Sequence, residues 1–244
     1  MIVKLGGSVI TDKSKPFTYR SDVVSALAEE IASSDEKTVV VHGGGSYGHT
    51  VAKQHGVTSE QAAGEPSAAS KTRGAMYELN ALFCRTLLEN KLSPYPFSPF
   101  DAVAKAGKGP VSTWLRGLLR QGLTPVTFGD VTLTSAGLKI LSGDLIVLEL
   151  ARFLKPERCV FALDADGVYE GGTRVIIPEL TPSRIRKMKV PAGEDATGGM
   201  KLKLEVAARI ASLGTRVCFV SGYRRNEFSK ALKGLEFYGT VVRP

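Results

Sequence analysis

The chain has 244 residues, of which 43% are hydrophobic and 23% are charged, and its formal net charge is +8. This length and composition predict a soluble globular protein with a substantial core rather than a disordered chain. No apolar run approaches the roughly 20 residues that a membrane-spanning helix needs. The positive charge is compatible with nucleic acid, an anionic membrane or anionic small molecules as partners.

The distribution of the basic residues favours a small anionic substrate over nucleic acid. Lysines and arginines are spread along the chain, and the densest group has no interleaved aromatic residues for base stacking: Arg184, Arg186, Lys187, Lys189, Lys201 and Lys203. The three cysteines, Cys84, Cys159 and Cys218, are widely spaced and lie among apolar residues. They predict buried free thiols, and the N-terminal MIVKLGGS has no signal-peptide layout, so we expect a cytoplasmic protein without a membrane or nucleic-acid partner.

Strand and helix patterns alternate along the chain. Apolar runs predict strands over 1–5, 37–42, 158–164, 216–220 and 238–242, and helical spacing predicts helices over 21–33, 67–90, 111–121, 144–153, 200–212 and 225–233. Ser21 or Asp22 is the expected N-cap of the first helix. Alternation around Gly129 and Gly137 predicts hairpins within 124–141. The whole predicts one α/β domain over 1–244, a three-layer αβα sandwich around a mostly parallel sheet.

The stretch VVVHGGGSYGH, residues 39–49, matches G-x-G-x-x-G through Gly43, Gly45 and Gly48. A dinucleotide fingerprint also requires an acidic residue about 20 positions on, at the end of the next strand. Residues 55–70 contain no strand pattern, so Glu60 and Glu65 do not fulfil that requirement. The stretch is therefore either another kind of phosphate site or a glycine-rich turn.

Three glycine loops together favour a phosphate site. They are KLGGS at 4–8, GGGS at 43–46 and TGGM at 197–200, and the last precedes a helix with Lys201 and Lys203. Ligands of open parallel sheets bind at the carboxyl ends of the strands, where glycine amides and helix N-termini can contact phosphate oxygens. The Walker A pattern and the H-R-D and D-F-G motifs of protein kinases are absent.

Four motifs in this order resemble the amino acid kinase superfamily over essentially the whole chain: K-L-G-G-S at 4–8, H-G-G-G at 42–45, D-A-D-G-V-Y at 164–169 and G-G-M-K-L-K at 198–203. V-I-T-D-K ending at Lys13, G-S-Y-G-H ending at His49 and S-G-D at 142–144 further resemble the isopentenyl phosphate kinases.

That resemblance implies phosphorylation of isopentenyl phosphate by ATP and Mg²⁺ in the archaeal-type mevalonate route to isoprenoids. It also implies an acceptor-binding lobe at about 1–155, an ATP-binding lobe at about 156–244 and a homodimer through the helix 67–90. Fosfomycin kinase, or another small phosphate or phosphonate kinase, is the alternative.

The resemblance also implies roles for individual residues. Lys4 would bridge the donor and acceptor phosphates, Lys13 would stabilise the transferring group, and Lys203 would hold the β- and γ-phosphates. Asp144 would orient the lysines, and His49 would donate a hydrogen bond to the acceptor phosphate. The implied nucleotide-binding residues are Lys4, Gly6, Gly7, Ser8, Gly45, Asp164, Asp166, Gly167, Tyr169, Gly198, Gly199 and Lys203.

The acceptor would contact Gly43, Gly44, His49 and Gly129, and its apolar tail would contact a helical stripe of Met76, Leu79 and Phe83. No side chain is expected to bind a metal directly, because Mg²⁺ would be held by the ATP phosphates. A phosphate monoester is already anionic near pH 7, so the reaction needs cations rather than a general base.

Each residue type also has a simpler interpretation when taken alone. Lys13 could be a solvated loop lysine and His49 a surface or capping histidine. Asp144 could be a helix N-cap, the pair at 166–167 an ordinary turn, and the stripe that begins at Met76 part of the core. His42 is expected to pack within the sheet.

Other functions fit the residues less well. Acetylglutamate, aspartate and uridylate kinases leave His49 without an evident task. A regulatory module that binds nucleotide without catalysis is the alternative from another class. It predicts loss of a catalytic lysine or aspartate, whereas Lys4, Asp144 and Lys203 are present.

Overall fold

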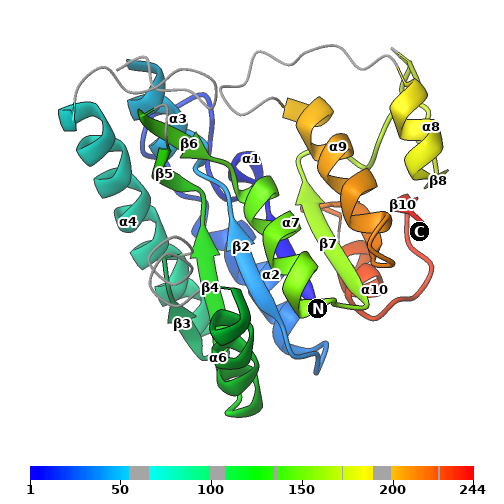
Figure 1. Ribbon diagram of the computed structural model, residues 1–244, viewed down its shortest axis with the longest axis horizontal. Coiled ribbons are helices and arrows are strands. Elements are labelled where there is room, and N and C mark those ends of the chain that lie inside the picture. Colours follow the sequence, from blue (N-terminus) through cyan, green and yellow to red (C-terminus); the bar gives the residue numbers. More distant parts are fainter. Residues whose placement is uncertain (55–65, 99–107, 135–136, 172, 189–198, 225) are drawn as a thin grey trace.

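The structure is a computed structural model that describes residues 1–54, 66–98, 108–134, 137–171, 173–188, 199–224 and 226–244. Its centre is an eight-stranded sheet in the order β3-β4-β2-β1-β7-β9-β10-β8 (Figure 1). Neighbouring strands pair in parallel except β9 and β10. The strands are β1 (Ile2–Leu5), β2 (Val39–His42), β3 (Pro94–Pro96), β4 (Thr124–Phe128), β7 (Arg158–Leu163), β8 (Glu179–Leu180), β9 (Arg216–Ser221) and β10 (Gly239–Val242).

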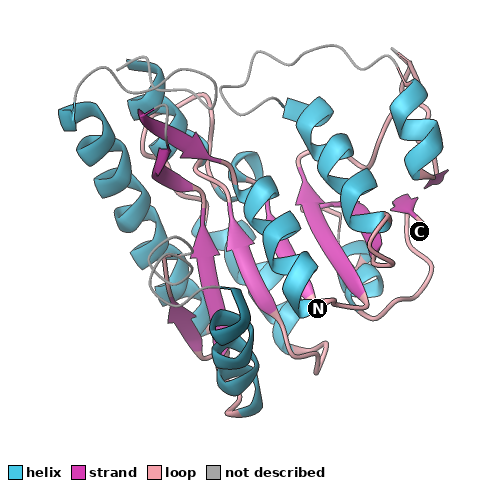
Figure 2. Ribbon diagram, viewed as in Figure 1, coloured by secondary structure: helices cyan, strands magenta, loops and turns pink. Residues whose placement is uncertain are grey.

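Helices cover both faces of this sheet, as Figure 2 shows. They are α1 (Gly7–Ile10), α2 (Ser21–Ala32), α3 (Gly45–Gln54), α4 (Pro66–Glu89), α6 (Lys108–Arg120), α7 (Gly143–Leu154), α8 (Pro182–Lys187), α9 (Gly199–Ala211) and α10 (Glu227–Leu232). A separate antiparallel hairpin joins β5 (Asp130–Thr134) to β6 (Gly137–Leu141). The predicted three-layer αβα sandwich with a mostly parallel sheet is confirmed.

The two faces carry two separate hydrophobic cores. Apolar residues of α7 and α9 pack on one face, and those of α2, α4 and α10 pack on the other. Because side chains alternate along a strand, Ile2 and Lys4 of β1 face α7 and α9, whereas Val3 and Leu5 face α2 and α4. This alternation places one lysine inside the layer that also contains the start of α7.

The predicted strands and helices are present, and the differences concern short elements and their ends. The sequence patterns did not indicate α1, β3, β8 or α8. The segment 124–128 is a strand of the main sheet, so only β5 and β6 form a hairpin. Arg20 occupies the N-cap position of α2, and its side chain makes no capping hydrogen bond, so the predicted cap at Ser21 or Asp22 is wrong.

The cysteines are free, with Cys159 and Cys218 buried and Cys84 half-buried. Among the described residues, no helix combines the length and hydrophobicity that crossing a membrane requires.

Candidate active site

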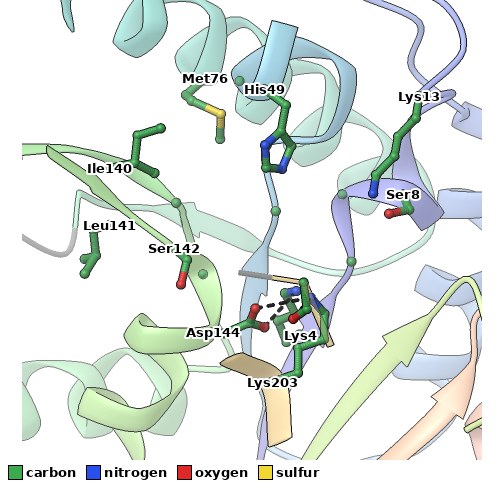
Figure 3. A pocket seen from close by; sticks show the side chains of 18 of the residues that line it. Lys4, Ser8, Lys13, His49, Met76, Ile140, Leu141, Ser142, Asp144 and Lys203 are labelled. Carbon is green, nitrogen blue, oxygen red and sulfur yellow. Dashed lines mark hydrogen bonds and ion pairs between the residues drawn. The ribbon is translucent and has the colours of Figure 1, made fainter. Parts of the chain in front are cut away.

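A cavity opens where the parallel strands of the sheet end (Figure 3). Leu5 at the end of β1 pairs with His42 and with Ala162, so the ends of β1, β2 and β7 are in register. The loops that follow these strands, and the first residues of α7 and α9, line the cavity. This is the edge at which open parallel sheets bind ligands, and helix N-termini there favour anions.

The first two glycine loops touch each other backbone to backbone. A Cβ atom on Gly43 would lie 2.6 Å from the amide nitrogen of Gly7. Gly45 has a φ of +47°, and a Cβ atom there would lie 2.6 Å from the carbonyl oxygen of Gly7. Thr11 joins the loops further, because its hydroxyl donates to the Gly7 carbonyl and accepts from the Ser46 amide. Only glycine allows this approach, which brings the ends of β1 and β2 to one point.

Asp144 holds two lysines at the cavity. Its carboxylate lies 2.9 Å from Nζ of Lys4 and 3.4 Å from Nζ of Lys203. Ser142 is the N-cap of α7, because its side chain accepts from the Leu145 amide, so the carboxylate of Asp144 is not used for capping. Gly143 lets the helix start approach β2, since a Cβ atom there would lie 3.2 Å from the His42 carbonyl oxygen.

The electrostatics of this cluster follow from burial and pairing. Burial favours a higher pKa for Asp144, but Lys4 first and Lys203 second outweigh it, and the pKa of the carboxyl is lowered. Burial lowers the pKa of Lys4, and the neighbouring carboxylate of Asp144 opposes that shift. Asp144 is therefore an anion that keeps two ammonium groups side by side at the cavity.

The opposite wall of the cavity is apolar. Figure 3 shows Met76, Ile140 and Leu141 on the side away from Lys4 and Lys203, with His49 between Met76 and the lysines. A Cβ atom on Gly44 would lie 3.0 Å from the sulfur of Met76, so this glycine makes room for the thioether. Lys13 and Ser8 approach from another direction in the same view. The cavity thus combines a cationic region with a hydrophobic one.

The structure brings most of the predicted site residues to this cavity. Those that line it are Lys4, Gly6, Gly7, Ser8, Lys13, Gly43, Gly44, His49, Met76, Gly129, Asp144, Asp164, Gly199 and Lys203. Gly198, which the sequence also indicated, lies outside the described residues.

Other predicted site residues do not line the cavity. Leu79 and Phe83 are fully buried in the core between α4 and the sheet. They share the helical stripe of Met76, but α4 continues past the cavity and over the sheet. Gly45 lies behind the cavity against Gly7 and Thr11.

In the segment after β7, Asp164 lines the cavity, but the predicted residues Asp166, Gly167 and Tyr169 do not. Asp166 pairs with the guanidinium of Arg224 at 2.6 and 3.0 Å. A Cβ atom on Gly167 would lie 2.8 Å from the Thr240 hydroxyl, and Tyr169 forms a bridge with Ile176.

Sequence reasoning did not assign several residues that line the cavity: Gly48, Thr72, Asp130, Ile140, Leu141, Ser142, Gly143, Leu163 and Met200. Gly48 was visible as the third glycine of G-x-G-x-x-G, and Ser142 and Gly143 directly precede Asp144. The alternating pattern of 130–141 predicted a hairpin without indicating which of its sides faces a ligand.

Comparison with known proteins agrees with the family that the four sequence motifs indicated. The Amino acid kinase family matches residues 1–221, and the chain therefore belongs to the amino acid kinase family. Similar proteins within it are isopentenyl phosphate kinases. The one from Thermoplasma acidophilum is 29% identical, and the match covers 100% of both chains. The one from Haloferax volcanii is 34% identical over 84% of this chain and 85% of the relative.

A plant relative and a solved structure agree with this grouping. The isopentenyl phosphate kinase of Arabidopsis thaliana is 30% identical over 90% of this chain and 76% of its own length. A crystal structure of an isopentenyl phosphate kinase substrate complex superposes with a TM-score of 0.80 at 27% identity, covering all of both chains. The family resemblance that the four motifs indicated is confirmed.

Proposed function

We propose that this chain transfers the γ-phosphoryl group of ATP to isopentenyl phosphate and forms isopentenyl diphosphate. The observation that carries the proposal is the composition of the cavity. Lys4 and Lys203 stand on one side of it, and Met76, Ile140 and Leu141 stand on the other. A phosphate with a short hydrocarbon tail has the same two parts, and a tail without hydrogen-bonding groups requires an apolar, shape-limited site.

The polar side of the cavity suits phosphoryl transfer between two anions. The acceptor phosphate is itself the nucleophile, so the protein has to neutralise charge and align the reactants. Asp144 keeps Lys4 and Lys203 within ion-pair distance of one carboxylate, which places two positive charges together. In this proposal Lys4 bridges the two substrates, Lys203 binds the β- and γ-phosphates, and Lys13 stabilises the transferring group.

The nucleotide and acceptor would occupy adjoining parts of the cavity. ATP would contact Gly6, Gly7 and Ser8 and the start of α9, and the acceptor phosphate would contact Gly43, Gly44, Gly129 and His49. In this proposal residues at about 1–155 form the acceptor-binding lobe, from which the loop at 6–8 also reaches the nucleotide, and residues at about 156–244 form the ATP-binding lobe.

Magnesium would reach the site as part of the nucleotide substrate. Within the described ranges, no group of three or more His, Cys, Asp or Glu residues could hold a metal ion. The carboxylate of Asp144 is engaged by Lys4 and Lys203. In this proposal Mg²⁺ is bound through the ATP phosphates.

The proposed setting is the cytoplasm and the archaeal-type mevalonate route, with the chain acting as a homodimer. The free thiols of Cys84, Cys159 and Cys218 support a reducing compartment. The exposed side chains of Tyr77 and Leu88 on α4 support a dimer contact along that helix. Light scattering of the purified protein measures the oligomeric state directly.

The experiment that tests the function is ADP release from Mg-ATP with a panel of acceptors. The panel is isopentenyl phosphate, dimethylallyl phosphate, fosfomycin, acetylglutamate, UMP and buffer alone, and His49→Ala is assayed beside the wild type. We expect a strong preference for isopentenyl phosphate and a loss of turnover in the variant. Preferred turnover of fosfomycin would move the protein to the rival activity. Bound ATP without turnover on any acceptor would contradict the proposal.

A further inference from the structure

His42 is a buried histidine next to the cavity that the proposed reaction does not use. It ends β2 and is 0% exposed. Its ring lies between Phe83 of α4 and Phe128 of β4, at centroid distances of 4.8 and 5.3 Å. The ring points to the α4 face of the sheet, opposite to the face that contains Lys4 and Asp144. It is therefore not available to contact a phosphate.

Both ring nitrogens of His42 have partners. Nδ1 lies 3.0 Å from the carbonyl oxygen of Gly43, and Nε2 lies 3.2 Å from Oδ1 of Asn80 on α4. Both partners are oxygens, and a neutral ring has only one proton to donate. The Gly43 carbonyl oxygen can only accept, whereas the side-chain amide of Asn80 can turn to present its NH₂ group, so we place the proton on Nδ1. Burial lowers the pKa of His42 to about 4, which keeps the ring neutral near pH 7. With the Asn80 amide turned in this way, its NH₂ group donates to Nε2.

The bond from Nδ1 fixes the orientation of one peptide group of the glycine loop. In a planar trans peptide the carbonyl and the following N–H point in opposite directions. The carbonyl of Gly43 points at the ring of His42, so the N–H of Gly44 points away from the ring and the core. Gly44 lines the cavity, so we infer that this N–H, on the side away from the ring, can contact a phosphate bound there.

Glycine alone would not hold this orientation. Gly43 and Gly44 have no side chains to anchor them, and glycine peptides rotate more freely than any others. Two backbone hydrogen bonds lie next to this peptide. The Gly43 amide donates to the Leu5 carbonyl, and the Gly129 amide donates to the His42 carbonyl. Both of those bonds hold the His42–Gly43 peptide, and the amides of Tyr47 and Gly48 hold the Gly44–Gly45 peptide by donating to the Gly44 carbonyl. The ring of His42 tethers the Gly43–Gly44 peptide between them.

We propose that His42 is a positioning residue: its Nδ1–H holds the Gly43–Gly44 peptide so that the Gly44 amide donates to the phosphate transferred in the cavity. Asn80 extends the arrangement to α4, the helix that also supplies Met76 to the apolar wall. The amide that binds phosphate and the helix that bounds the tail are thus linked through one ring. This inference rests on the proposed function, because it assigns the amide to a phosphate of that reaction.

Two substitutions of His42 separate positioning from packing. Asn carries an amide nitrogen on the same side-chain carbon that bears Nδ1 in histidine, so His42→Asn retains a donor toward Gly43. His42→Leu fills the apolar site but has no donor. We expect the Leu variant to be the more thermally stable of the two, because an unpaired polar group in that site is costly.

Activity should follow the opposite order. We expect His42→Leu to lower kcat by roughly 10- to 100-fold, since small misplacements of aligned groups have effects of that size. We expect His42→Asn to recover most of that loss, with the KM for ATP little changed in both variants. Equal kcat values in the two variants, or kcat values that follow the melting temperatures, would overturn the inference.

A second readout does not depend on turnover. The ¹⁵N spectrum of the histidine rings distinguishes the two neutral tautomers, and we expect the proton of His42 on Nδ1 at pH 7. A proton on Nε2 would overturn the inference even in an active enzyme. A wild-type chain that turns over no acceptor, with the proton on Nδ1, would contradict the proposed function and leave the orientation of the loop supported.

Discussion

The two faces of the sheet place different buried polar side chains next to the cavity: a charged pair on one face and a neutral histidine on the other. On one face, Lys4 and Asp144 are each less than a tenth exposed and form an ion pair. On the other face, His42 is equally buried but neutral, because burial lowers its pKa to about 4 and no carboxylate pairs with it among the contacts of its ring. A buried side chain stays charged only where an oppositely charged partner lies beside it.

This difference explains how one cavity can contain cations and still accept a hydrocarbon. Lys4 and Lys203 lie on the face with α7 and α9, where Asp144 holds them, whereas the buried carboxylate of Asp130, which also lines the cavity, is paired with Arg73 of α4. The face with α4 supplies hydrogen bonds to the backbone and an apolar wall. Substitutions on either face should therefore have different consequences.

Asp144→Asn should have the largest effect. Removing one partner of a buried ion pair leaves an uncompensated charge and lowers the free energy of unfolding by about 3–5 kcal/mol. The variant should also lose phosphoryl transfer by roughly 100-fold or more, because Lys4 and Lys203 lose the group that holds them. Urea denaturation and ADP release measure the two effects.

A matched control for Asp144 lies on the same helix. Glu149→Gln removes an exposed ion pair with Arg152, which should change the free energy of unfolding by less than about 1 kcal/mol and leave turnover unchanged. Similar losses in the two variants would show that α7, rather than the buried carboxylate, is sensitive to substitution.

The neutral histidine predicts a pH dependence of stability. The folded pKa of His42 is about 4, below its ordinary value of 6.5, so the unfolded chain binds a proton first as the pH falls. The contribution is complete above pH 6.5 and is lost as the pH decreases to 4, by about 3 kcal/mol in total.

Urea titrations of the wild type and of His42→Leu between pH 7 and 4 test this dependence. The variant should lack the step, and the difference between the two chains cancels titrating groups that they share. Parallel curves for the two chains would mean that folding leaves the pKa of His42 unchanged, and would contradict the lowered pKa.

Gly43→Ala should disturb the close backbone contact between the loops that follow β1 and β2. A Cβ atom at this position would lie 2.6 Å from the Gly7 amide nitrogen, which is backbone and cannot move aside cheaply. We expect a loss of about 2 kcal/mol in stability and a clear fall in kcat. Gly74→Ala on α4, where a Cβ atom meets nothing within 4 Å, should instead stabilise slightly. Equal behaviour of both variants in thermal melts would contradict the backbone contact.

Met76→Ala should change which acceptors are preferred and leave phosphoryl transfer itself intact. It removes an apolar side chain that lines the cavity, so phosphates with longer tails should gain by about tenfold in kcat/KM relative to isopentenyl phosphate. Leu79→Ala on the same helix is the control, since Leu79 is buried in the core and should lose stability without changing that ratio. A changed ratio in the Leu79 variant would place the tail deeper in the core than the structure does.

The fold was predictable to the extent that its elements are long enough to show periodicity. The strands of the central sheet are apolar runs because helices cover both of their faces. By contrast, α1 has 4 residues, α8 has 6 and β8 has 2, which is too short for a pattern to be recognised. The cap of α2 was missed because the helix begins one residue after Arg20 without any side-chain cap.

The site was predictable where it depends on strand ends. Parallel strands bring their carboxyl ends to one edge, so loops at Gly6, Gly43 and Asp164 had to meet. Helical spacing showed that Met76, Leu79 and Phe83 share a face, but it could not show where along that face the cavity ends. The hairpin side chains Ile140 and Leu141 carry no motif, and only the fold places them opposite the lysines.

The most direct test of the central claim is a competition followed by ³¹P NMR. Isopentenyl phosphate and fosfomycin at equal concentration are mixed with Mg-ATP and the wild-type chain in one tube. We expect the isopentenyl phosphate signal to be replaced by two coupled diphosphate signals while fosfomycin persists, because the apolar wall selects the hydrocarbon tail. Consumption of fosfomycin first, or ADP formed without a new diphosphate, would contradict it.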